Sequence, residues 1–114
     1  MPNSQFLQQI RSQPDSIQFA DCIDFIDSNF QFTPTAFDNG SHHNPIGENN
    51  GSCKIFAFGI INKLTEQQML TCFGDYYRND VINNPDAGDH QNIRQFMLNG
   101  WAGIKFSGQA LTKK

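Results

Sequence analysis

The stretch IFAFGII, Ile55–Ile61, is the longest apolar run of the chain and decides how the other elements must pack around it. Periodicity cannot separate a buried helix from a buried strand in a run without polar residues. Ser52 is a good N-cap residue, and the apolar pattern extends to Leu64. We therefore predict a helix that begins at Cys53 and is packed on all sides. The run is far too short to span a bilayer, so no membrane contact is predicted.

The overall composition predicts one small domain with an aromatic core. The chain has 114 residues, of which 11 are phenylalanines, and its formal net charge is −3. A chain of this length normally forms a single domain. Lys and Arg form no cluster beyond Lys113-Lys114. Because binding to DNA or RNA requires a basic surface, we expect no nucleic-acid partner.

Two helices are predicted before the apolar run. The first contains Phe6 and Ile10 and is ended by Pro14. Asp15 or Ser16 can cap the second helix. The apolar face of this second helix recurs every three or four positions, at Phe19, Ile23, Ile26 and Phe30.

Two more helices are predicted after it. Thr65 and Gln68 form a capping box, and the helix that follows continues to about Ile82, weakened at Gly74. Asp89 can cap a last helix, which ends at the Asn99-Gly100 pair. Together with the central helix, the chain would have about five helices.

Alternation of apolar and polar residues predicts two strands, near residues 31–37 and 103–107, that pair with each other. Pro34 places the first of them at a sheet edge, because proline cannot donate a hydrogen bond to a neighbouring strand. Asn39-Gly40 turns the chain into a polar loop, residues 38–51. We therefore predict an α+β fold, predominantly helical, with a small antiparallel sheet.

Cys53 is the strongest candidate for a nucleophile. It is one of three irregularly spaced cysteines, which is not the pattern of a disulfide framework. In the first turn of a helix its pKa would be lowered by the helix dipole. His90 would then be the base and Asp89 would orient His90. The favoured interpretation is that Cys53 is a small apolar residue in a packed first turn.

The histidines and the segment Tyr76–Asp80 offer other chemistry. His42 and His43 lack a known metal-ligand spacing, so we predict surface histidines, no metal and no cofactor. Tyr77 is expected to face the core. Arg78 either pairs with a nearby carboxylate or binds an anionic group through its two parallel donors.

Five motifs, taken in order, resemble the HopJ type III effector family of bacterial proteins. They are FTPTAFDNG (32–40), GSCKIFAFG (51–59), FGDYYRNDV (73–81), DHQNIRQFM (89–97) and GWAGIKFSG (100–108). The resemblance covers nearly the whole chain. It implies a bacterial protein of unassigned biochemical activity that is delivered into a host cell by a type III apparatus. The alternative is a role in the cytoplasm of the producing bacterium.

Two hypotheses from different classes follow. The preferred one is a non-enzymatic protein that binds a host or bacterial protein or a small polar ligand where the loop 38–51 lies beside the loop 85–94. The other is a small cysteine-dependent enzyme built on Cys53. Candidate ligand-binding residues are the polar positions that match the family motifs or flank them: Asn39, Asn44, Ser52, Tyr77, Arg78, Asp80, Asn92 and Arg94.

Overall fold

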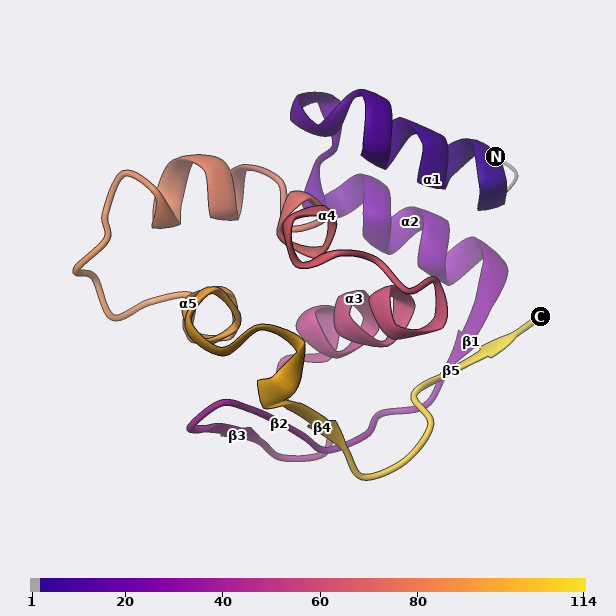
Figure 1. Cartoon of the computed structure of the whole chain (residues 1–114). Helices are drawn as coiled ribbons and strands as arrows, with labels where there is room; N and C mark the ends of the chain where they lie inside the picture. Colours follow the sequence, from indigo (N-terminus) through magenta and orange to yellow (C-terminus); the bar gives the residue numbers. More distant parts are fainter. Residues whose placement is uncertain (1–2) are drawn as a thin grey trace.

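Helix α3, Asn50–Ile61, runs through the middle of the computed structural model, which describes residues 3–114 (Figure 1). Its side chains from Ile55 to Phe58 are all buried, which confirms a central helix. The prediction that it is packed on all sides was wrong at its C-terminal end, where Ile60 and Ile61 are exposed. The predicted start was wrong. The helix begins three residues earlier, after Asn49, whose backbone is left-handed with a φ of 53°. Asparagine tolerates this conformation, and Ser52 therefore lies inside the first turn and is not the cap.

Helices α1, Asn3–Ser12, and α2, Phe19–Asn29, lie on one side of α3 (Figure 1). The predicted caps Asp15 and Ser16 instead belong to a short 3-10 turn, η1, Pro14–Ser16. Helix α2 starts after Gln18, whose N–H donates to the Asp21 carboxylate at 3.0 Å. This local bond fixes the start of the helix two residues later than expected.

The predicted long helix after Thr65 is divided into two pieces. The capping box is confirmed, because Gln68 N–H donates to Thr65 Oγ1 at 3.1 Å and starts α4, Glu66–Thr71. The chain then breaks at Gly74, where φ is +60°, and continues as a π-helix, η2, Tyr76–Val81. A Cβ atom at Gly74 would lie 2.6 Å from the backbone nitrogen of Phe19. Only glycine allows this close approach of two backbones.

The last helix is α5, Gln91–Asn99, and a 3-10 turn, η3, Gly100–Gly103, follows it. Gly100 has a φ of +60°, so the predicted exit at Asn99-Gly100 is confirmed. The predicted cap Asp89 is replaced by His90, a second left-handed residue, with a φ of 51°. Asp89 binds the Arg94 side chain instead.

Two small antiparallel sheets complete the α+β fold. Strand β2, Phe37–Asn39, lies between β3, His42–Asn44, and β4, Ile104–Phe106. Phe37 pairs with Phe106, which confirms the predicted pairing of the two strand regions. The single strand predicted for residues 31–37 is interrupted, since β1, Phe30–Phe32, pairs with a strand that was not predicted, β5, Leu111–Lys113. Pro34 lies in the interruption and cannot extend the hydrogen-bond ladder.

The core is built from aromatic rings around α3. Phe56 lies at its centre, with ring centroids 5.4 Å from Phe73, 5.3 Å from Phe96 and 6.4 Å from Trp101. Trp101 also donates from Nε1 to the Leu64 carbonyl at 2.9 Å. No helix within residues 3–114 is long and apolar enough to cross a membrane.

Candidate functional site

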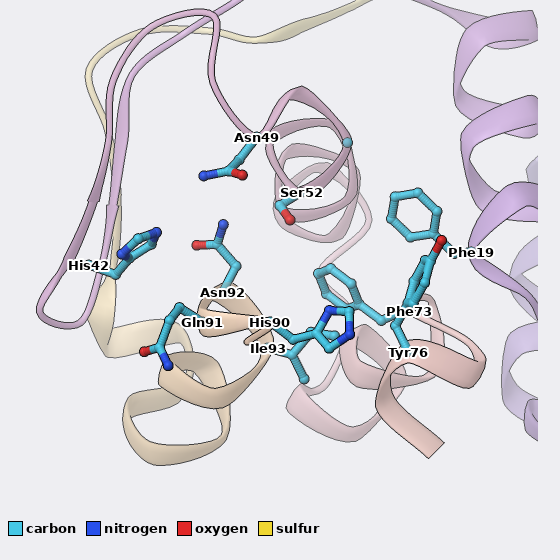
Figure 2. Close-up of a pocket in the computed structure, with 11 residues that line it drawn as sticks. Phe19, His42, Asn49, Ser52, Phe73, Tyr76, His90, Gln91, Asn92 and Ile93 are labelled. Atoms are coloured by element: carbon cyan, nitrogen blue, oxygen red, sulfur yellow. The ribbon is translucent and has the colours of Figure 1, made fainter. Parts of the chain in front are cut away.

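A pocket of about 480 Å³ opens between the N-terminal ends of α3 and α5 (Figure 2). It is the place where segments far apart in the sequence meet. Helix α2, strand β3 and the π-helix η2 contribute the remaining walls. The lining residues are Phe19, His42, Asn49, Gly51, Ser52, Phe73, Tyr76, His90, Gln91, Asn92 and Ile93.

The two helix ends that face this pocket share an unusual feature. Each follows a left-handed residue, Asn49 or His90, and neither of these side chains caps its helix. The first N–H groups of a helix have no partner within it and carry the positive end of the helix dipole. Ser52 and Asn92 lie in these two first turns and line the pocket. The polar wall is therefore rich in hydrogen-bond donors.

An aromatic wall faces these helix ends. The ring of Tyr76 lies 5.3 Å from Phe19 in an edge-to-face arrangement and 5.3 Å from the ring of His90. Phe73 and Ile93 are both almost fully buried and form the apolar base. Figure 2 shows Phe19, Phe73 and Tyr76 grouped on one side, with Asn49, Ser52 and Asn92 on the other. The pocket thus has an apolar side and a polar side.

Asp80 holds His90 in place at the edge of the pocket. Nε2 of His90 lies 3.2 Å from Asp80 Oδ2 and 4.0 Å from Asp89 Oδ2. Asp89 is held by Arg94, with an Nη2–Oδ1 distance of 2.8 Å. This hydrogen bond lowers the pKa of Asp89 below its ordinary value. The expected pairing of His90 with Asp89 as its orienter is therefore replaced by a closer pairing with Asp80.

A cluster of buried amides connects the β2–β3 hairpin to α5. Asn92 Nδ2 donates to Asn44 Oδ1 at 2.9 Å, and Asn92 Oδ1 accepts from Asn44 and Asn39, both at 3.1 Å. Asn49 Nδ2 donates to the same Asn44 oxygen at 2.7 Å. Asn39 and Asn44 are fully buried, so of the three buried asparagines only Asn92 lines the pocket. The cluster brings together the loops 38–51 and 85–94, which were predicted from the sequence to lie side by side.

Comparison with known proteins identifies the family. A family model described as HopJ type III effector protein matches residues 3–111. The chain belongs to the HopJ family. It is also similar to a solved structure described as "Crystal structure of unknown function protein VPA0580", with 51% identity and a TM-score of 0.98. That match covers 100% of this chain and 95% of the other. No curated protein matches the chain.

Two arginines that were candidates for ligand binding donate hydrogen bonds to backbone carbonyl groups of the HopJ protein. Arg78 donates to the carbonyl of Pro14 at 3.1 Å and of Ile17 at 2.5 Å, and lies 3.6 Å from the Asp75 carboxylate. It joins η2 to the turn before α2. Arg94 donates to the Asp89 carbonyl at 2.6 Å and the Pro85 carbonyl at 3.2 Å, which closes the loop before α5.

The other sequence candidates in this HopJ chain divide between core and pocket. Tyr77 packs against the core, as expected. His42 lines the pocket, whereas His43 pairs with Asp38 on the exposed face of the hairpin. Tyr76 was missed, because a π-helix changes the faces that a regular helical spacing predicts. Within residues 3–114, no three His, Cys, Asp or Glu side chains are arranged to hold a metal ion.

Cys53 lacks the lowered pKa that the enzyme hypothesis requires. The residue is fully buried, and its thiol donates to the Thr35 carbonyl at 3.4 Å. Burial raises the pKa of Cys53 above its ordinary value, although the first turn of α3 has a favourable dipole. Cys22 is also fully buried, and a hydrogen bond with Cys72 together with burial raises its pKa. The structure favours the alternative in which Cys53 is a packed residue.

We expect the three thiols to react with iodoacetamide about a hundredfold or more slowly in the folded protein than in urea, because reaction requires opening of the core. A raised pKa leaves less thiolate at any given pH, so the labelling rate of Cys53 should still be rising above the pH at which an ordinary thiol is fully ionised. Mass spectrometry of the labelled peptides measures each rate. Rapid labelling of Cys53 in the folded state would restore it as a candidate nucleophile.

Proposed function

We propose that this HopJ protein is a non-enzymatic binding protein that takes a small organic anion into the pocket between α3 and α5. The observation that carries the proposal is the charge of the lining. The chain has a net charge of −3, yet none of the described lining residues is Asp or Glu. Two uncapped helix ends, His42 and His90 face the same space. Such helix ends bind carboxylate and phosphate groups through their free N–H groups.

The two sides of the pocket define the ligand further. The donor-rich helix ends suit the charged group, whereas the rings of Phe19 and Tyr76 suit a flat apolar body. The volume of about 480 Å³ lies in the range of pockets that hold small molecules. The family description suggests secretion by a type III system. Because the pocket would recognise an anion by its charge and shape, the anion can come from the bacterium or from a host.

The proposal is tested with two probes that share a ring and differ in the sign of their charge, benzoate and benzylamine. We expect benzoate to shift the backbone amide NMR signals of residues 50–52 and 91–92, and benzylamine to leave them unchanged. Ser52→Asp places a carboxylate in the pocket and should weaken benzoate binding by roughly tenfold or more through charge repulsion.

Ser4→Asp is the matched control, because Ser4 is exposed in the first turn of α1, outside the pocket. Both substitutions add a negative charge near a helix N-terminus, so their effects through the dipole are alike. Ser4→Asp should bind benzoate as the unmodified chain does. Equal binding of benzoate and benzylamine, or an unchanged affinity in Ser52→Asp, would overturn the proposal.

A further inference from the structure

The two ring nitrogens of His90 lie in different surroundings. Nε2 faces the carboxylates of Asp80, at 3.2 Å, and Asp89, at 4.0 Å. The other nitrogen, Nδ1, points toward the interior of the pocket, where Ser52 and Asn92 lie (Figure 2). A carboxylate accepts hydrogen bonds and cannot donate them, so the proton of the neutral ring belongs on Nε2. Nδ1 then presents a lone pair to the pocket.

We infer that Nδ1 of His90 determines which anions the pocket selects. It favours those that carry an O–H or N–H donor on the body of the molecule, such as hydroxy- or amino-substituted aromatic carboxylates. The inference rests on the proposed function and deepens it. The helix ends supply donors to the anionic group, and Nδ1 supplies an acceptor at the aromatic wall beside Tyr76. An anion without a second polar group leaves this acceptor unpaired, which costs affinity.

Asp80 is the positioning residue for this acceptor. It lies on the π-helix η2, four positions after Tyr76, and both side chains contact the His90 ring. Tyr76 steadies the plane of the ring, with an interplanar angle of 38°. Asp89 approaches the same nitrogen from the loop before α5, but its other oxygen is held by Arg94. Without the Asp80 carboxylate, the neutral His90 ring should therefore carry its proton on either nitrogen.

The first measurement is the tautomer of His90 in the full chain, read from the imidazole nitrogen chemical shifts by NMR. We expect a protonated Nε2 and an unprotonated Nδ1 on the neutral ring, and a mixture of both tautomers in Asp80→Asn. The second measurement compares affinities for meta-hydroxybenzoate and benzoate. One added hydrogen bond should make the hydroxylated probe bind roughly two- to tenfold more tightly.

Two replacements of His90 separate the acceptor from the rest of the ring. The left-handed backbone, with a φ of 51°, suits both glycine and asparagine. His90→Asn keeps an acceptor near the position of Nδ1 and should retain the preference for the hydroxylated probe. His90→Gly removes the acceptor and should bind both probes equally.

The outcomes distinguish this inference from the proposed function. If benzoate fails to shift the amides of residues 50–52 and 91–92, the anion site itself is wrong. If benzoate binds but the hydroxyl group adds nothing, or if Nδ1 is found protonated on the neutral ring, only the role of His90 is overturned.

Discussion

Replacing Phe56 with alanine should lower the free energy of unfolding by about 3–5 kcal/mol, the usual cost of deleting a buried phenylalanine ring. Phe56 is fully buried in α3 and contacts rings from four other segments. Its centroid lies 5.9 Å from Phe37, 5.4 Å from Phe73 and 5.3 Å from Phe96. Because these rings come from a strand, a turn and a helix, no single movement can fill the space.

Urea denaturation followed by far-ultraviolet circular dichroism measures this effect, since it reports helix content and does not depend on the environment of Trp101. Leu98→Ala is the control. Leu98 is also an apolar residue in a helix, but it is 77% exposed, and its loss should change stability by at most about 0.5 kcal/mol. A loss below about 1.5 kcal/mol in Phe56→Ala would show that the core rearranges to close the cavity.

Replacing Asn92 with alanine should lower the free energy of unfolding by about 2–4 kcal/mol, because it leaves buried polar groups without partners. Asn92 Oδ1 accepts from Asn39 and Asn44, and its Nδ2 donates to Asn44. Asn39 and Asn44 are both fully buried, so water cannot replace these bonds without entering the core. The loss should also separate the β2–β3 hairpin from α5.

Asn83→Ala is the matched control, because Asn83 is exposed in the turn after η2. Its stability should stay within about 0.5 kcal/mol of the unmodified chain. Hydrogen exchange provides a second readout: in Asn92→Ala the amides of residues 37–44 should exchange faster, whereas those of α1 should be less affected. Unchanged exchange in the hairpin would show that the strands hold it without the amide cluster.

The sequence predicted those parts of the fold that depend on a local pattern. The apolar run within α3, the capping box at Thr65 and the exit at Gly100 are all determined by neighbouring residues, and each is confirmed. The break at Gly74 has a different origin. It depends on the approach of Gln18 and Phe19, more than 50 positions away, which no local pattern contains. Strand β5 was missed for the same reason, since its partner β1 is even more distant in sequence.

The site was predicted less completely, again for physical reasons. Asn44 and Asn92 were selected together from two loops, and they do meet. The pairing of His90 with Asp80 depends on the π-helix, whose extra residue per turn moves Asp80 toward α5. For Cys53 the sequence placed the thiol in the first turn of a helix but did not show how deeply it is buried. Burial of the thiol raises its pKa, and the hydrogen bond to the Thr35 carbonyl group is a smaller, opposing effect.

The absence of a side chain at Gly74 has a consequence for the aromatic wall of the pocket. At this position the backbone of the chain lies against that of Gln18 and Phe19, and nothing larger than hydrogen fits between them. Phe19 and Tyr76 leave this junction on either side and together form the aromatic wall. The separation of these two rings is thus set by main-chain dimensions, which do not change when nearby core residues are exchanged. A relative could alter much of its interior and still keep these two rings in edge-to-face contact.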